Sequence, residues 1–276
     1  MDDSRSTGGE LGPGALPPGL ALLWGAGRSS RRGPKPGLSV EAVVGAAVDI
    51  ADAEGIAAVS MARVAKRLGF TTMSLYRYVS SKDALVDLMI DTVVAEPTQP
   101  EPDEDWRPAL ERWVWEYLAA LRRHPWIVQV PVSAPPLGPR SLLWLEAGLM
   151  ALSGTPLDED EKVGIVLLVT GFVRSEARLW GELEAAAGAA AGPEEPDRVD
   201  ADAPEESAEA AGTELPSYGG LLRALIDEQA YPALMQVVDS GAFDGPQEYS
   251  EEDVRFGLDR ILDGVAALVV AREPGR

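Results

Sequence analysis

The chain of 276 residues contains no cysteine and a single histidine, His124. Disulfides and thiolate metal sites are therefore excluded, and nothing indicates an oxidising compartment. His124 directly precedes Pro125, a position that favours a helix end over metal ligation. We therefore expect no metal and no cofactor.

Long apolar runs are also missing. No run approaches the ~18 residues that a membrane span requires. The apolar stretch at residues 20–24 follows two early aspartates and is too short for a signal peptide. We therefore expect a cytoplasmic protein without a membrane partner, long enough for two domains with real cores.

Positive charge is scarce overall but locally concentrated. The formal net charge is −21, which by itself disfavours binding to DNA phosphates. Between Arg28 and Lys82, however, nine basic residues face only four acidic ones, a local balance of +5 that leaves −26 for the rest of the chain. A basic end on an acidic body would be oriented by the field of DNA, although solubility and disordered segments also favour acidity.

The most informative pattern lies at residues 59–82, VSMARVAKRLGFTTMSLYRYVSSK. Ser60 is an N-cap for a short helix over residues 61–68. Gly69 ends that helix with a sharp turn, and Thr71 or Thr72 caps a second short helix that runs to about residue 79. Small Ala65 lies where the two helices would cross. This pattern predicts a helix-turn-helix.

The two predicted helices divide into a buried and an outer face. The expected shared core consists of Val64, Leu68, Phe70, Leu75 and Tyr78. The outer face of the second helix holds Thr72, Met73, Ser74, Tyr76 and Arg77, which suits a reader of the DNA major groove. An ordinary helical hairpin inside a globular core is the alternative.

Helical periodicity continues through the chain, and we find no strand pattern and no repeat. The predicted fold class is all-α, with a DNA-binding domain at residues 37–97 and a helical regulatory and dimerisation domain at residues 104–273. Further helices are expected at 39–54, from Ser81 to Pro97, 106–123, after Pro125, 140–152, 158–186, 218–239 and 251–271. Residues 187–216 read as a mobile acidic loop.

Residues 1–36 are rich in Gly, Pro and Ser and show no helical period, which predicts a disordered arm. The arm ends in RSSRRGPKPG at residues 28–37. A basic arm of this kind can enter the minor groove beside a helix-turn-helix, and a merely solvated tail is the alternative.

Residues 38–96 resemble the N-terminal domain of the TetR family of transcriptional regulators, above all in GFTTMSLYRYVSSKDAL at residues 69–85. The segments RRHPW at 122–126 and GFVRSEARLW at 171–180 resemble the tetracycline-repressor-like regulatory domain more loosely. The resemblance implies that Tyr76 and Lys82 bind backbone phosphates. The implied DNA-binding set is Ser60, Thr71, Thr72, Met73, Ser74, Tyr76, Arg77, Tyr78 and Lys82.

One such domain contacts too few base pairs for a specific operator. Two domains about one DNA turn apart, ~34 Å, read an inverted repeat on double-stranded DNA, so a homodimer is expected. The resemblance places the dimer interface on residues 158–186 and 251–272. The predicted apolar stripe is Leu258, Ile261, Leu262, Val265, Leu268 and Val269; a helix buried within one chain is the alternative.

The second domain is expected to sense a small molecule. Five of the seven tryptophans lie between residues 106 and 144, and large aromatics can line an apolar cavity or simply fill a core. The candidate pocket is Trp113, Tyr117, Trp126, Trp144, Phe172 and Arg174, although Arg174 has surface pairing with Glu176 or Glu182 as its alternative. Tetracycline repressors use imidazole to bind the metal-chelated drug, so a chain with one histidine favours a different effector.

We therefore expect a ligand-responsive dimeric transcriptional repressor. A DNA-binding protein of the same fold without small-molecule sensing is the second hypothesis. A helical enzyme is the third and weakest, because no nucleophile–base pair, glycine-rich phosphate loop or carboxylate–histidine cluster is present.

Overall fold

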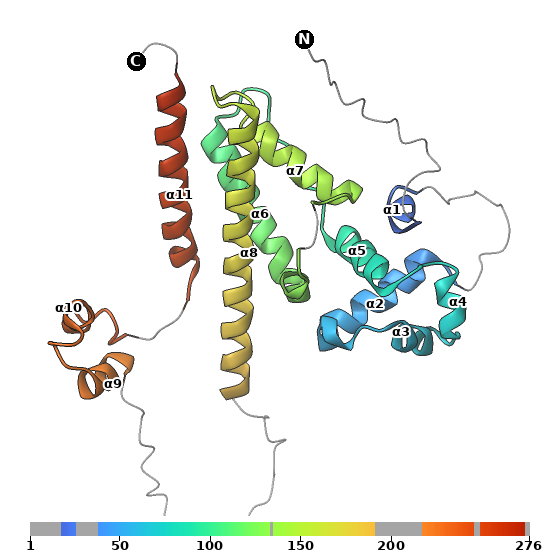
Figure 1. Cartoon of the computed structure of the whole chain (residues 1–276), viewed down its shortest axis with the longest axis horizontal. Coiled ribbons are helices and arrows are strands. Elements are labelled where there is room, and N and C mark those ends of the chain that lie inside the picture. Colours follow the sequence, from blue (N-terminus) through green and yellow to red (C-terminus); the bar gives the residue numbers. More distant parts are fainter. Residues whose placement is uncertain (1–17, 26–37, 133–134, 191–216, 246–248, 274–276) are drawn as a thin grey trace, which may run out of the picture. The chain divides into compact units, whose positions relative to one another are not determined.

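A computed structural model describes residues 18–25, 38–132, 135–190, 217–245 and 249–273 (Figure 1). These residues form α-helices and two short 3₁₀ helices without a strand, which confirms the all-α expectation for this part of the chain. None of their helices is both long and apolar enough to cross a bilayer. The helices are α1 (Pro18–Leu23), α2 (Val40–Glu54), η1 (Ile56–Ala58), α3 (Met61–Leu68), α4 (Thr72–Tyr76), α5 (Lys82–Val93), α6 (Trp106–Arg123), η2 (Pro125–Gln129), α7 (Pro139–Ala151), α8 (Glu159–Ala190), α9 (Tyr218–Leu225), α10 (Pro232–Asp239) and α11 (Glu251–Arg272).

The short helix α1 was not expected, because residues 1–36 show no helical period. It packs against α5. The next residue after α1 is Trp24, whose indole N–H donates to the Leu137 carbonyl at 2.9 Å. A long-range contact of this kind leaves no periodic signal in the sequence. The remaining parts of the predicted arm, including the basic segment at 28–37, lie outside the described residues.

Helices α2 to α5 form the part of the protein that we call the head. Helix α2 begins after Ser39, whose side chain accepts the Ala42 N–H, and ends at Gly55, as predicted. Its buried face and those of α3, α4 and α5 meet in one apolar core. That core includes Val43, Val44, Ala47, Ile50, Val59, Val64, Leu75, Val79, Leu85 and Met89.

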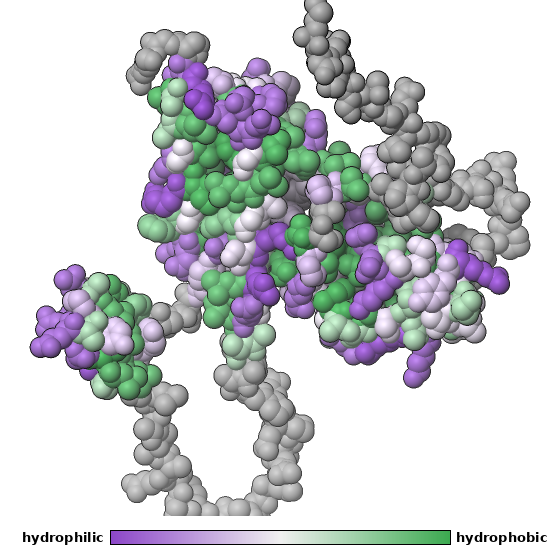
Figure 2. Space-filling view, in the orientation of Figure 1, coloured by the Kyte–Doolittle hydropathy of each residue, from purple (hydrophilic) through white to green (hydrophobic). Residues whose placement is uncertain are grey.

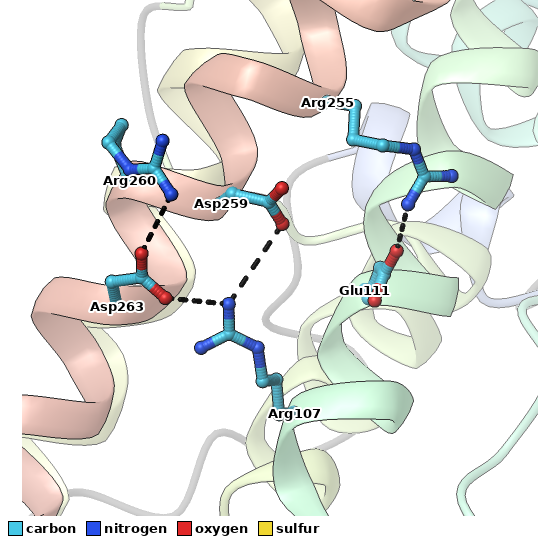
Figure 3. A network of polar contacts seen from close by, with 6 residues as sticks. All are labelled: Arg107, Glu111, Arg255, Asp259, Arg260 and Asp263. Carbon is cyan, nitrogen blue, oxygen red and sulfur yellow. Dashed lines mark hydrogen bonds and ion pairs between the residues drawn. The ribbon is translucent and has the colours of Figure 1, made fainter.

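Helices α6, α7, α8 and α11, with η2, form what we call the body. Helix α8 is a continuous rod of 32 residues that extends four residues beyond its predicted end. Helix α11 lies beside α6, to which it is joined by ion pairs (Figure 3): Arg107 contacts Asp263 at 2.8 Å and Asp259 at 3.9 Å. Arg255 adds a third pair with Glu111 at 2.8 Å.

The described residues between 185 and 253 belong to a separate compact unit that contains α9 and α10. Within this unit, Arg223 of α9 donates to the Asp244 carboxylate and to the Val238 carbonyl. The helical segment expected over residues 218–239 is divided into α9 and α10. Asp227 accepts the N–H groups of Gln229 and Ala230 in a turn, and α10 begins only at Pro232. Most of the predicted acidic loop, residues 191–216, lies outside the described residues.

Candidate nucleic-acid interface

The turn between α3 and α4 is built as the sequence predicts. Ser60 accepts the Arg63 N–H and starts α3, and Gly69 ends it in the left-handed conformation with φ 75°. The Phe70 N–H then donates to the Ala65 carbonyl at 2.9 Å, which satisfies an otherwise free carbonyl at the helix end. Thr71 is the cap of α4, because its side chain accepts the Ser74 N–H.

The core of this unit differs from the prediction at one position. Val64, Ala65 and Leu75 are buried, and Leu68 is half-buried, as expected. Phe70, however, is 39% exposed. The chain reverses at Gly69, so the period of α3 no longer determines where the next side chain points.

Helix α4 presents a small exposed face. Met73 is 75% exposed, Tyr76 is 46% exposed, and Arg77 follows them at the end of the helix. Thr72 is half-buried, and the Ser74 hydroxyl lies 2.9 Å from that of Thr71. The side chains with free surface here are therefore apolar, phenolic and cationic.

The predicted end of α4 near residue 79 is wrong, because α4 stops at Tyr76. The Tyr78 N–H donates to Leu75 O in a tighter turn, and the Tyr78 side chain is half-buried. Tyr78 thus contributes to the core more than to the exposed face.

The basic side chains of the head fall into two groups. Arg63 pairs with Glu54, and Arg67 pairs with Asp49 at 3.1 Å, so both guanidinium groups are partly neutralised by α2. The ammonium and guanidinium groups of Lys66, Arg77 and Lys82 have no hydrogen bond or ion pair with the part of the chain that the structure describes, and all three are exposed. Positive charge available to a phosphate is therefore carried by the second group.

Lys82 has a further advantage as an anion contact. It is the first residue of α5, where backbone N–H groups and the helix dipole favour negative charge, and Ser81 caps the helix through the Ala84 N–H. Lys66, by contrast, was not among the predicted DNA-binding residues. Its position opposite the buried face of α3 is the signal that would have identified it.

The aromatic residues predicted to line an effector pocket are only partly brought together. Trp113, Tyr117 and Trp144 form a cluster with ring centroids 5.1 to 5.7 Å apart. The Trp113 indole N–H donates to the Trp144 carbonyl at 2.9 Å, and that of Trp144 to the Ala95 carbonyl at 2.8 Å. Both tryptophans are buried, so the cluster is a packed core.

The other three predicted pocket residues have separate roles. Trp126 is buried and donates to Asp52 at 2.7 Å. Phe172 packs against Gly257 of α11, where a Cβ would be crowded by its ring. Arg174 donates to the carbonyl of Ile127 in η2 and to that of Val130 just after it, which is neither the predicted pocket role nor the alternative pairing with Glu176 or Glu182.

An apolar groove with a volume of about 510 Å³ runs along α7. It lies between the Trp24 side chain and one face of that helix. Its lining residues are Trp24, Pro139, Leu142, Leu143, Leu145, Glu146 and Leu149.

Three of the six residues predicted to form the dimer interface on α11 are not available to a partner. Leu258, Leu262 and Val265 are buried against the protein's own body, so they have no free surface for a partner. Periodicity identified a buried face but not what covers it. Ile261, Leu268 and Val269 are half-buried, and apolar side chains gather over α8 and α11 (Figure 2). The exposed large apolar side chains of these two helices are Val163, Leu167, Leu168, Leu179, Leu183, Phe256 and Val270.

Among the described residues, no group of three or more His, Asp or Glu side chains is placed to hold a metal ion. The ring nitrogen Nδ1 of His124 lies 2.8 Å from Asp52 Oδ1. The histidine thus bonds a head helix from the end of α6.

Comparison with known proteins agrees with this arrangement. Residues 43–89 match the family model described as "Bacterial regulatory proteins, tetR family", and residues 99–269 match that described as "Tetracyclin repressor-like, C-terminal domain". The chain is 38% identical over 270 residues to the HTH-type transcriptional repressor DrrR1 of Streptomyces coeruleorubidus, an alignment that covers 95% of this chain and 89% of the relative.

Solved structures show the same architecture. ActR of Streptomyces coelicolor in complex with (S)-DNPA has a TM-score of 0.64 at 24% identity, over 84% of this chain and 99% of that one. ActR in complex with actinorhodin has a TM-score of 0.62 at 25% identity, over 85% and 99%.

Proposed function

Because this chain belongs to the tetR family of bacterial regulatory proteins, we propose that it is a dimeric transcriptional repressor that a small molecule releases from its operator. DNA binding and regulation of transcription are the activities of the family. The single observation that supports the assignment of the interface is the exposed face of α4 and the start of α5. There Tyr76, Arg77 and Lys82 have free polar groups with no partner in the described part of the chain.

These groups suit the two tasks of a DNA reader. Lys82 at a helix N-terminus and the Tyr76 hydroxyl can bind backbone phosphates, which fix register and orientation. Arg77 can bind guanine O6 and N7, and Met73 offers an apolar surface to a thymine methyl group. Phosphate contacts strengthen binding to every sequence, whereas base contacts select one.

Selection of bound DNA from random duplexes tests the interface. We expect an inverted repeat, and we expect Tyr76→Ala and Lys82→Ala to weaken binding to selected and scrambled duplexes by the same factor. Arg123→Ala is the control, because it removes an exposed arginine in the last turn of α6, outside the head and outside the proposed dimer helices. Unchanged affinity and salt dependence in both head variants would contradict this docking.

Dimerisation is proposed through α8 and α11. Leu167 and Leu168 are exposed on α8 beside Gly164 and Gly171, which have open space in front of them. Two such faces related by a two-fold axis bury apolar surface that one chain leaves in water. Leu168→Glu should convert the dimer to a monomer in sedimentation experiments at micromolar concentration, whereas Leu225→Glu, at another exposed leucine in a separate unit, should not.

The proposed effector is an aromatic small molecule. The complex of the similar ActR with actinorhodin supports this class. Actinorhodin titrated into the protein–operator complex should raise the operator Kd and quench tryptophan fluorescence. An operator Kd that stays constant at saturating actinorhodin would remove the support for this effector.

A second candidate is a regulator of the same fold that senses no small molecule. The packing of the aromatic cluster favours it, because both buried indole N–H groups already have acceptors. A tryptophan-quenching screen with small apolar compounds separates the two. Compounds that quench and also release the operator establish sensing, and quenching without release favours the second candidate.

A further inference from the structure

A buried carboxylate of the head caps a helix of the body. Asp91, on the last turn of α5, is only 8% exposed. Its Oδ1 accepts the backbone N–H groups of Arg140 and Ser141 at 3.0 and 3.1 Å, and the Ser141 hydroxyl at 3.3 Å. These donors lie in the first turn of α7, which would otherwise have free N–H groups.

Helix α7 has no cap of its own. The residue before it is Gly138, which has no side chain to accept a hydrogen bond. Asp91 provides that acceptor from a helix 49 residues earlier in the chain, and its negative charge also lies at the positive end of the α7 dipole. The cap of a body helix is therefore a head residue.

The absence of a side chain at Gly138 allows Asp91 to approach the start of α7. Gly138 has φ −73° and ψ 145°, a conformation that any residue adopts, so its backbone does not require glycine. A Cβ atom at this position would overlap the Asp91 carboxylate. A glycine here is therefore needed only for the close approach of Asp91.

Two neighbouring bonds join the same helices. Arg140 donates from its side chain to the Thr92 carbonyl, and Trp144 donates to the Ala95 carbonyl at 2.8 Å. Trp144 also accepts the indole N–H of Trp113 from α6. The end of α5 and the residues just after it thus contact α7 at three successive places, and α7 is bonded to the aromatic cluster.

We propose that Asp91 is a positioning residue that sets the orientation of the head by capping α7, so that any movement of α7 is transmitted to α5. This inference rests on the proposed function, in which the body controls how the head meets DNA. Lys82 lies at the other end of α5, about 13 Å along the helix axis from Asp91. A rotation of α5 about the cap therefore displaces a proposed phosphate contact.

Distances between spin labels on the head and the body test the proposal. Because the chain has no cysteine, Ser80→Cys and Ala119→Cys introduce two unique labelling sites at exposed positions. Labelled protein is diluted into an excess of unlabelled protein, so that one labelled chain is observed per molecule. The measurement requires neither DNA nor an effector.

Four variants are compared on this background. Asp91→Ala removes the acceptor, and Gly138→Ala keeps it but forces it away. Each should broaden the distance distribution by roughly twofold, because the head then samples more orientations. Asp91→Asn should keep the narrow distribution, since an amide oxygen also caps a helix. Asp87→Ala removes another carboxylate of α5, one that is exposed, and should change nothing.

The double variant Asp91→Ala/Gly138→Ala separates positioning from general damage. If the two residues act through one contact, the second change should add no further broadening to the first. Operator affinity should fall in the same order as the distributions broaden. Distributions that stay narrow in Asp91→Ala and Gly138→Ala, even with a lowered melting temperature, would overturn the proposal and leave Asp91 as a stabiliser of α7. A failure of DNA binding in the unmutated protein would instead contradict the proposed function.

Discussion

Asp52 and Trp126 are joined by a hydrogen bond of 2.7 Å from the indole N–H to Oδ1. Asp52 lies on α2 of the head, and Trp126 lies in η2 of the body. The same oxygen also contacts Nδ1 of His124 at 2.8 Å. One carboxylate oxygen of the head thus bonds two rings that follow α6.

Removal of the Asp52 carboxylate should destabilise the protein. Trp126 is only 2% exposed, so Asp52→Ala removes the protein acceptor of an indole N–H on a buried side chain. A cost of about 1–3 kcal/mol is expected in the free energy of unfolding, measured with urea. Asp49→Ala removes another aspartate of α2, one whose partner Arg67 is exposed, and should cost less than about 1 kcal/mol. Equal losses in the two variants would contradict the role of the indole bond.

Two glycines of the head should respond to alanine with opposite signs. Gly69 has φ 75°, where a Cβ is strained although no neighbouring atom blocks it, so Gly69→Ala should destabilise by about 1–2 kcal/mol. Gly45 lies within α2 with open space around it, and Gly45→Ala should stabilise by about 0.5–1 kcal/mol. Thermal unfolding followed by circular dichroism gives both signs. Stabilisation by Gly69→Ala would show that the turn is not left-handed.

Acid should weaken the ion pairs that join α11 to α6 and α8. The hydrogen bond from Arg260, and then that from Arg107, hold the pKa of the Asp263 carboxyl below its ordinary value (Figure 3). Arg272, and then the Asp158 backbone, do the same for the pKa of Glu161. Because these pKa values are depressed in the folded state, the bonds stabilise the fold above the ordinary carboxyl pKa of about 4, and their contribution is lost as the pH falls through the lower folded values.

The double variant Asp263→Asn/Glu161→Gln tests this pH dependence. The free energy of unfolding should change less between pH 6 and pH 3 in the variant than in the original protein, since two linked protons no longer bind. Glu146→Gln is the control, because the carboxyl of Glu146 is exposed and has no hydrogen bond with the described residues. An identical pH profile for all three proteins would mean that the two carboxylates do not contribute.

The salt dependence of operator affinity should reflect the number of phosphate contacts that the head makes. Lys82→Ala should reduce the slope of log K against log salt concentration by about 0.9 for each head bound. Arg67→Ala removes a guanidinium that already pairs with Asp49, and should change the slope less. Fluorescence anisotropy at several salt concentrations measures both slopes. A larger change in slope for Arg67→Ala than for Lys82→Ala would mean that Arg67, and not Lys82, is the phosphate contact.

The features that the sequence could predict are those whose causes lie within a few residues. Ser39, Ser60 and Ser81 cap the helices that were expected, since each side chain bonds an N–H only three residues later. The left-handed turn at Gly69 follows from the absence of a Cβ. The helix-turn-helix and the all-α fold depend on such local signals.

The features that escaped prediction depend on partners distant in the chain. The buried face of α11 was found, but periodicity does not say that Leu258 packs within the same chain. Arg174 bonds carbonyls more than 40 residues away, and its neighbours in sequence gave no sign of this. The contacts of Asp52 and Asp91 are of the same kind, because a carboxylate in a helix looks solvated until its long-range donor is known.

Because α8 is one uninterrupted helix, residues can be inserted or deleted without disturbing its packing only at its ends. Its 32 residues place Leu168 and Leu179 on a common side, 11 residues or just over three whole turns apart. A single residue inserted between them would turn everything that follows by about 100°. Such an insertion would point half of the rod's apolar side chains in a new direction, so we expect natural variants to gain or lose residues at the ends of α8 and never in its middle.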